Sequence, residues 1–419
     1  MVTDLTNTYN QIIVIGNGFD LACGLPSNYS SFFNSIISKS DSNTTDYVNI
    51  SKNSINIWEL IFIYATHHPV TYSKSSDNIP WQDVEEVIKR CVSLNSDDDY
   101  TPCTPMISYH AMENTDQIFS NPITQAIALQ LCNRYPSLLD DVKKDAQRLG
   151  FLRGDGITID NQYWARNNNR IALTYIQELY QFEIKFKDYL SPHAAKTEYL
   201  KAAKELYLNI SNYCETKIET EKADVVLSFN YTTPLLELID KGDEEIDKTL
   251  WAEKNIHGTL STPTTKELPS PIIFGIDGFT PEGMRDGDVY QIFSKSYRQL
   301  NLKQQKLPTT MTNPLRTIFD PLQIPDSIRC IKIFGHSFGD ADYSYYKTIF
   351  NSVDIFNSNI IIYILYKKDH EPDTSSIYKL LNRYSDEVHN SSNVNSASRT
   401  DLLQQLLMED RIRLREISN

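Results

Sequence analysis

The sequence predicts an α/β fold with a mostly parallel sheet and a large, largely helical insertion. First, short apolar runs recur along the chain and several end in Gly, Asn or His, as parallel strands do where a loop begins. Second, the first two runs are separated by residues 16–223, a much longer segment than one crossover between parallel strands needs. Third, helical periodicity fills the later part of this segment. The predicted strands are Gln11–Ile15, Asp224–Phe229, Asn255–His257, Pro271–Phe274, Ile328–Phe334 and Asn359–Tyr366.

The first apolar run stops at a Gly-x-Gly turn, as in a Rossmann-like fold. Glycines there allow a tight turn and can expose backbone N–H groups to an anion at the next helix start. A short helix should follow over Phe19–Cys23, with Gly24 as its cap. Leu21 replaces the third glycine of the dinucleotide fingerprint, so a dehydrogenase is not expected. A tight turn without a ligand is the alternative to a nucleotide loop formed by Gly16, Asn17, Gly18, Phe19 and Asp20.

The insertion should occupy residues 40–220, between the first and second core strands. Arg170–Leu190 and Glu198–Cys214 have helical periodicity, so its later half should be a helical layer. Ser385–Thr400 is polar and predicts a loop, after which Asp401–Ile417 predicts a closing helix. We expect residues 1–419 to form a single domain, because strands from both ends complete one sheet.

The composition narrows the classes of partner. The 419 residues contain 40 Lys and Arg against 54 Asp and Glu, a net charge of −14, and no dense basic block, which disfavours nucleic-acid binding. No apolar run is long enough to span a bilayer, so no membrane partner and a cytoplasmic location are expected. The six cysteines are scattered without a Cys-x-x-Cys pair, and we expect no metal site and no disulfide framework.

Two polar residues follow neighbouring predicted strands. Asn230 closes the second strand, where its amide could hold a water or a ribose hydroxyl as both donor and acceptor. His257, followed by Gly258, repeats this layout on the next strand. A purely structural role is the alternative for each, but the two should converge on one crevice.

The turn after the fifth predicted strand, Gly335–Gly339, matches Gly-x-Ser-x-Gly, the pattern of a hydrolase nucleophile elbow. A serine hydrolase using Ser337 is therefore a rival reading. It would need an Asp and then a His after the serine, yet only His370 and His389 follow, both in polar sequence.

Trp81-Gln82-Asp83-Val84-Glu85 follows a proline and should open a helix. Acidic residues in the first turn of a helix interact favourably with the helix dipole. The segment could therefore be a solvent-exposed helix start, or it could contact residues that line the pocket. The sequence leaves the role of Trp81, Asp83 and Glu85 open.

Several of these segments resemble the bacteriophage abortive infection AbiH family. The blocks that carry the resemblance are Ile12–Tyr29, Leu227–Thr232, Ile256–Gly258 and Phe334–Phe338 with Asp342 behind it, and more weakly Trp81–Glu85. They fall in the family's order and span most of the chain. The resemblance implies a role in antiphage defence, with a phage-derived trigger and an oligomer both compatible with the sequence.

Three of these features resemble a diverged Sir2-type site: the Gly-rich first loop with its Gly-Leu-Pro turn, Asn230 at a strand end, and His257-Gly258. That resemblance implies NAD as substrate or ligand, Asn230 orienting water or ribose, and His257 acting as a base. It also implies that the nucleotide lies against Gly335, His336, Ser337 and Asp342, with Ser337 and Asp342 near its adenosine half. The Sir2 zinc module is missing, so peptide deacetylation is not expected. Cleavage of NAD or a related nucleotide at the N-glycosidic bond is the predicted activity, and a non-catalytic nucleotide-sensing module that signals to a partner is the alternative.

Overall fold

The computed structural model resolves the chain into two compact units, which are described separately. The first comprises residues 1–27, 187–264 and 303–419, and the second comprises residues 28–186 and 265–302. The prediction of one domain over 1–419 with an insertion at 40–220 stays a prediction. The described residues are 10–36, 56–67, 84–85, 87–88, 130, 134–135, 152–153, 156–157, 169–213, 224–261, 272–277, 291–304, 328–368, 370–391 and 401–417.

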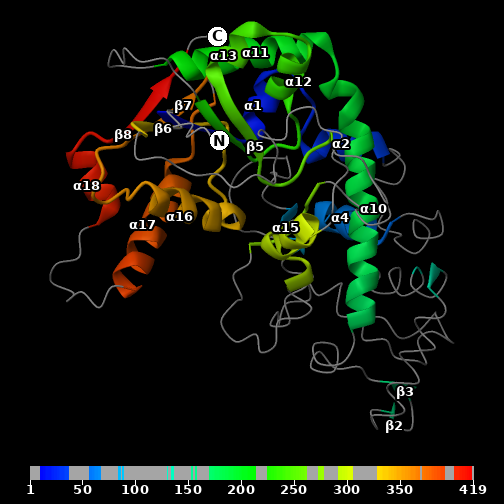
Figure 1. Ribbon diagram of the computed structural model, residues 1–419. Helices are drawn as coiled ribbons and strands as arrows, with labels where there is room; N and C mark the ends of the chain where they lie inside the picture. The colour runs from blue at the N-terminus through cyan, green and yellow to red at the C-terminus, as the bar shows by residue number, and fades with distance from the viewer. Residues whose placement is uncertain are drawn as a thin grey trace, which may run out of the picture. The chain divides into compact units, whose positions relative to one another are not determined.

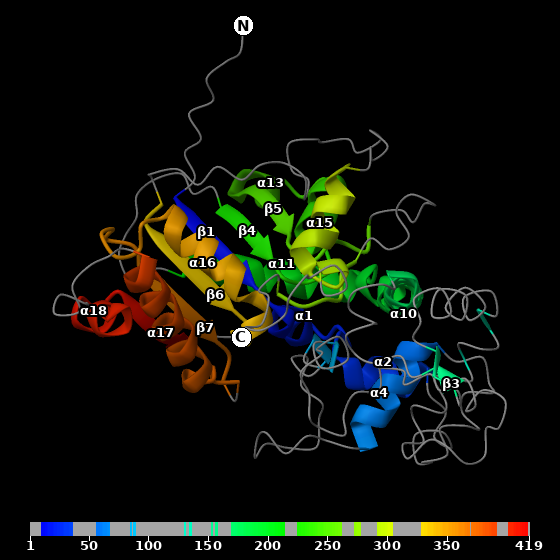
Figure 2. The ribbon, with the colours of Figure 1, turned by 90° about the horizontal axis from the view of Figure 1, so that it is seen from below.

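The first unit contains a six-stranded sheet in which every pair of neighbouring strands is parallel. Its strand order is β5-β4-β1-β6-β7-β8. Figure 1 shows β8 and β5 toward opposite sides of the sheet, and Figure 2 shows β4 and β1 between β5 and β6. In chain order these core strands run 3-2-1-4-5-6, which is the Rossmann order. The predicted α/β, Rossmann-like fold is confirmed. The strands are β1 Gln11–Ile15, β4 Asp224–Ser228, β5 Leu250–Asn255, β6 Cys330–Phe334, β7 Ile361–Tyr366 and β8 Ile412–Glu416.

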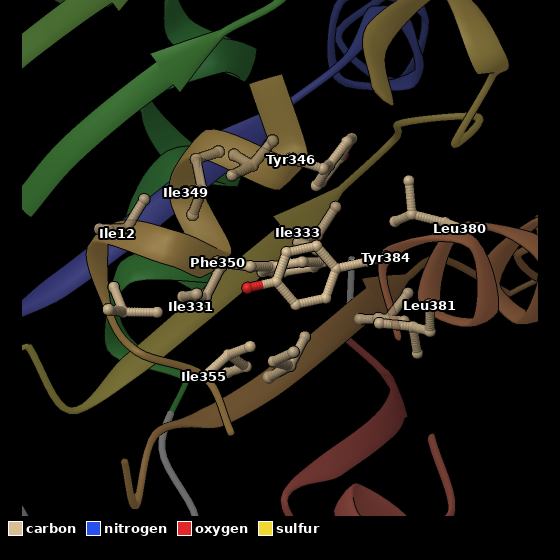
Figure 3. Close-up of a cluster of buried hydrophobic side chains, with 14 of the residues drawn as sticks. Ile12, Ile331, Ile333, Tyr346, Ile349, Phe350, Ile355, Leu380, Leu381 and Tyr384 are labelled. Atoms are coloured by element: carbon tan, nitrogen blue, oxygen red, sulfur yellow. The ribbon is translucent and has the colours of Figure 1, made fainter. Parts of the chain in front are cut away.

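Helices cover both faces of this sheet, with α11 (Thr197–Asn212) on one face and α16 (Tyr343–Ser352) and α17 (Thr374–Ser391) on the other (Figure 2). Strand side chains alternate between the faces, so alternate residues of each strand enter the core under α16 and α17. Figure 3 shows part of this core, which includes Ile12, Ile331, Ile333, Tyr346, Ile349, Phe350, Ile355, Leu380, Leu381 and Tyr384.

The face under α11 carries a buried cation. Lys332 Nζ donates to the carbonyl oxygens of Ile210 and Ser211, over 3.0 and 2.7 Å, at the last turn of α11. A cation at this end is favourable because the helix carbonyls there lack intrahelical partners. The remaining short helices of this unit are α1 Asn17–Ala22, α12 Pro234–Asp240, α13 Glu244–Thr249, η2 Asp340–Asp342 and α18 Leu402–Met408.

Three sequence predictions in this unit are wrong. β5 ends at Asn255, and the predicted strand over Asn255–His257 is mostly a turn. The closing helix stops at Met408, because Asp410 adopts a positive φ of 52° and the alternating sequence after it forms β8 instead. The start of the predicted loop over Ser385–Thr400 is helical, since α17 continues to Ser391.

The second unit is built around aromatic side chains. Its described elements are α2 Tyr29–Ile36, α4 Ile57–His67, the part of α10 (Asn169–Ala194) up to residue 186, the part of α15 (Lys295–Gln304) up to residue 302, and the short pair β2 Leu152–Arg153 and β3 Gly156–Ile157. Phe182 lies 5.5 Å from Phe32 and 5.1 Å from Phe62 between ring centroids. These rings form one packed cluster.

A buried ion pair completes this unit. Arg298 binds the carboxylate of Glu183 through the two terminal nitrogens of its guanidinium group, and the same carboxylate accepts a hydrogen bond from Phe274 N–H. The backbone of Phe274 is thereby satisfied by side chains, and the strand predicted over Pro271–Phe274 is wrong for its described residues. No helix in the described ranges of the chain is long and apolar enough to cross a membrane.

Candidate functional site

The candidate site lies within the first unit, at the edge where the parallel strands end. Ile15, Ser228, Asn255 and Phe334 form one row of paired residues across β1, β4, β5 and β6. Two positions after this row, each strand is followed by a polar residue: Asn17, Asn230, His257 and His336. The strand order reverses between β1 and β6, and in open α/β sheets ligands bind at the carboxyl ends of the strands beside such a reversal.

Backbone contacts lock together the loops after β1 and β6. Gly18 N–H donates to Gly335 O over 2.8 Å, and Phe19 N–H donates to Gly16 O over 2.9 Å. A Cβ on Gly335 would lie 2.5 Å from Phe19 N, and Gly335 has φ of +65°. A Cβ on Gly16 would lie 2.6 Å from Gly335 O. Close approach of two backbones therefore explains these glycines, and the N–H groups of Gly18 and Phe19 are occupied within the protein.

Asn17 ties the same loop to the turn that follows α1. Ser27 Oγ donates to Asn17 Oδ1, and Leu25 N–H donates to Asp20 O over 2.9 Å. Gly24 adopts φ of +80° after the helix, as its predicted role as a cap requires.

Asp20 is a buried carboxyl held by two hydroxyl groups. Tyr199 OH donates to Asp20 Oδ1 over 2.7 Å, and Thr232 Oγ1 lies 3.0 Å from both carboxylate oxygens. Burial raises the pKa of Asp20 from 3.8 to about 7, although hydrogen bonds from Tyr199 and Thr232 and the nearby amide of Asn230 oppose the rise. Near neutral pH this carboxyl can both bind and release a proton.

The turn after β4 carries Asn230 and is fixed by the end of β5. Asn255 Nδ2 donates to the carbonyl oxygens of Asn230 and Thr232, over 2.9 and 2.7 Å. Asn230 is 4% exposed, and neither its amide nitrogen nor its amide oxygen makes a hydrogen bond of normal geometry to a described residue. Buried amides are nearly always hydrogen-bonded, so the amide of Asn230 has the capacity to bind a polar group of a ligand.

His257 and His336 share one carboxylate. His257 Nε2 lies 3.1 Å from Asp342 Oδ1, and His336 Nε2 lies 3.2 Å from Asp342 Oδ2. The ring of Phe229 packs against both imidazoles, with its centroid 5.5 Å from that of His257 and 4.4 Å from that of His336. An apolar environment strengthens such charge-assisted contacts.

The geometry argues against Ser337 as an activated nucleophile. His336 uses Nδ1 to accept Phe338 N–H over 2.9 Å and Nε2 to contact Asp342, so neither nitrogen is available to Ser337. The positive φ of this turn falls on Gly335 and on Phe338, whose φ is 58°, and not on Ser337. In a nucleophile elbow the strained turn is what presents the serine.

A second buried carboxyl lies on β5. Glu253 Oε2 accepts Leu236 N–H, at the first turn of α12, over 3.2 Å. Burial raises the pKa of Glu253 to about 8, and the nearby charges of Asp20 and Glu237 add to the rise. Within the described ranges, no group of three His, Cys, Asp or Glu side chains is arranged to hold a metal ion.

Sequence reasoning missed the residues that organise these groups. Thr232 and Asn255 stand inside the quoted motifs, so their polar side chains at strand ends could have been singled out. Tyr199 reaches Asp20 from 179 positions away along the chain, and no local pattern predicts that contact. Trp81 and Asp83 lie outside the described residues, whereas Glu85 forms an ion pair with the buried Lys295 in the second unit.

Comparison with known proteins now supplies a family. The model of the family described as "Bacteriophage abortive infection AbiH" matches residues 12–366. The chain belongs to the AbiH family. This membership supports a role in abortive infection, the antiphage defence that was predicted. No curated protein matches the chain, and the likeness to Sir2-type proteins stays a prediction.

Proposed function

We propose that this AbiH protein cleaves NAD or a related nucleotide at the N-glycosidic bond once infection triggers it. The observation that carries the proposal is the buried amide of Asn230, which has unused hydrogen-bonding capacity beside Asp20 at the strand-order reversal. A ribose hydroxyl or a water offers the donor and acceptor that such an amide needs. The proposed ligand is therefore the ribose half of a nucleotide.

The reaction breaks the bond between the anomeric carbon and the nitrogen of nicotinamide, and the bonding electron pair leaves with nicotinamide. Water then forms a bond to the anomeric carbon, and its proton passes to a base. In the proposal Asn230 orients the ribose or the water, and His257 takes the proton. Asp20, with a pKa of about 7, is ionised in part of the molecules and can stabilise the positive charge that develops on the sugar.

The remaining predicted contacts are part of the same proposal. The nucleotide would lie against Gly16–Asp20 and against Gly335, His336 and Ser337, whereas the carboxylate of Asp342 lies against His257 and His336. Because the N–H groups of Gly18 and Phe19 are engaged within the protein, we expect the loop after β1 to shape the site more than to bind phosphate. Phosphate contacts would then come from other groups.

The test is turnover by the purified full chain. NAD, NADP and ATP are each incubated with the protein and followed by chromatography. Asn230→Ala and His257→Ala should each lower turnover by about 10²–10⁴-fold, the usual effect of losing one positioned group. Asn209→Ala and His370→Ala, which change exposed residues of the same types, should leave it unchanged. Wild-type turnover in both site variants would contradict the proposal.

The sensing alternative gives a different result in the same experiment. A nucleotide that raises the melting temperature of the protein but is recovered intact would favour a module that signals to a partner. In infected cells, the cleavage proposal predicts reduced phage yield together with lower NAD, and both effects should be lost in His257→Ala. Protection at unchanged NAD levels would again favour signalling.

A further inference from the structure

Asp342 has the position of a helix cap but does not act as one. It is the N-cap residue of α16, yet its side chain makes no hydrogen bond to the first turn of that helix. Asp is among the best N-cap residues, and an unused cap forgoes about 1 kcal/mol. The carboxylate is directed instead to His257 and His336.

The hydrogen bonds of His336 fix the proton at that end of the cluster. His336 Nδ1 accepts Phe338 N–H over 2.9 Å, so a neutral His336 must carry its proton on Nε2. That Nε2–H donates to Asp342 Oδ2 over 3.2 Å. Phe338 reaches this geometry at a φ of 58°, a strained conformation for a residue other than glycine.

The other carboxylate oxygen then acts on His257. Asp342 Oδ1 lies 3.1 Å from His257 Nε2, an electrostatic contact whose geometry is not that of a normal hydrogen bond. At this distance a carboxylate oxygen attracts an N–H and repels a nitrogen lone pair, which favours the neutral tautomer of His257 with its proton on Nε2 and its lone pair on Nδ1. Both imidazoles are at least 95% buried, so solvent competes little for these contacts.

We infer that Asp342 is a positioning residue that sets the tautomer of His257, with Nδ1 as the basic atom, and that His336 anchors Asp342 for this task. The inference rests on the proposed function insofar as His257 is the base. It departs from the expectation that Asp342 binds the adenosine half of a nucleotide. The tautomer itself is a property of the protein without any ligand.

The first test measures that tautomer directly. The full chain is labelled with ¹⁵N-histidine, and the two ring nitrogens of His257 are assigned by comparison with His257→Gln. We expect Nε2 protonated and Nδ1 unprotonated in wild type above the pH at which the ring becomes neutral. A proton on Nδ1 would overturn the inference, whether or not the protein cleaves NAD, and no variant at Asp342 is needed for this result.

The second test separates positioning from capping. The amide introduced by Asp342→Asn is as good an N-cap as Asp but offers one acceptor and one donor, so it cannot accept from both imidazoles. We expect an altered ring tautomer in His257 or His336 and a kcat lowered on the order of 10²–10⁴-fold with KM little changed. Asp386→Asn, at an exposed position on α17, is the control.

Each outcome of the second test decides the inference. Unchanged ring nitrogens and unchanged kcat in Asp342→Asn would leave Asp342 as a structural residue and refute it. If the wild type shows no turnover while the expected tautomer is observed, the proposed function fails and the positioning stands. If Asp342→Asn does not fold, His336→Gln provides the second variant, since it removes the anchor and should disturb the nitrogens of His257.

Discussion

Replacing Asp20 by Asn should change how the stability of the protein depends on pH. Burial raises the pKa of Asp20 from 3.8 to about 7, so the fold favours its protonated form. The contribution of Asp20 to the free energy of unfolding is therefore fully present below pH 4 and is lost as the pH rises through the folded pKa. A rise of about three pKa units corresponds to about 4 kcal/mol at 1.36 kcal/mol per unit.

Asp20→Asn removes this ionisation while its amide oxygen can still accept from Tyr199 and Thr232. We expect the variant to gain about 4 kcal/mol relative to wild type between pH 4 and pH 8. Urea unfolding followed by circular dichroism across this range measures the difference. Asp386→Asn, at an exposed site, should show no such trend. A difference between Asp20→Asn and wild type that is constant over the range would refute the reasoning.

Three further predictions follow from the geometry of the site. Gly335→Ala should destabilise the protein by more than about 3 kcal/mol, because the new Cβ would lie 2.5 Å from Phe19 N. Gly242→Ala is the control in the same urea denaturation assay. Gly242 has a φ of +85° and open space around it, so this variant should show only the backbone strain of about 1–2 kcal/mol. Asn255→Ala should lower the free energy of unfolding by about 2–3 kcal/mol, because the carbonyl groups of Asn230 and Thr232 lose the side-chain donor that binds them. Nucleotide turnover should fall as well. An unchanged unfolding midpoint would show that the turn after β4 does not depend on the Asn255 amide. A fluorophosphonate probe should leave Ser337 unlabelled by mass spectrometry, and stoichiometric labelling would restore the hydrolase interpretation.

The sequence by itself determined where most of the core strands lie and where the site begins. Parallel strands buried on both faces appear as continuous apolar runs, so β1, β4, β6 and β7 could be located from composition alone. Turn residues mark where the apolar runs stop, which is why Asn230 after β4 and His257 before Gly258 could be singled out as candidates from the sequence. β8 was missed because Ile412 and Leu414 alternate with two arginines shortly after a helix, and a helical pattern was continued through them.

Only the tertiary structure decided which groups act together. Tyr199 meets Asp20, Asp342 meets His257, and Gly335 meets Gly18 through contacts between segments far apart in the sequence. A local pattern records the preference of a residue for strand, helix or turn, but the partner of a buried polar group is set by how elements pack. The glycines of the first loop are a further example. In the sequence Gly16 and Gly18 suggested a loop that binds phosphate, and the structure shows that the close approach of the backbone at Gly335 leaves no room for a side chain there.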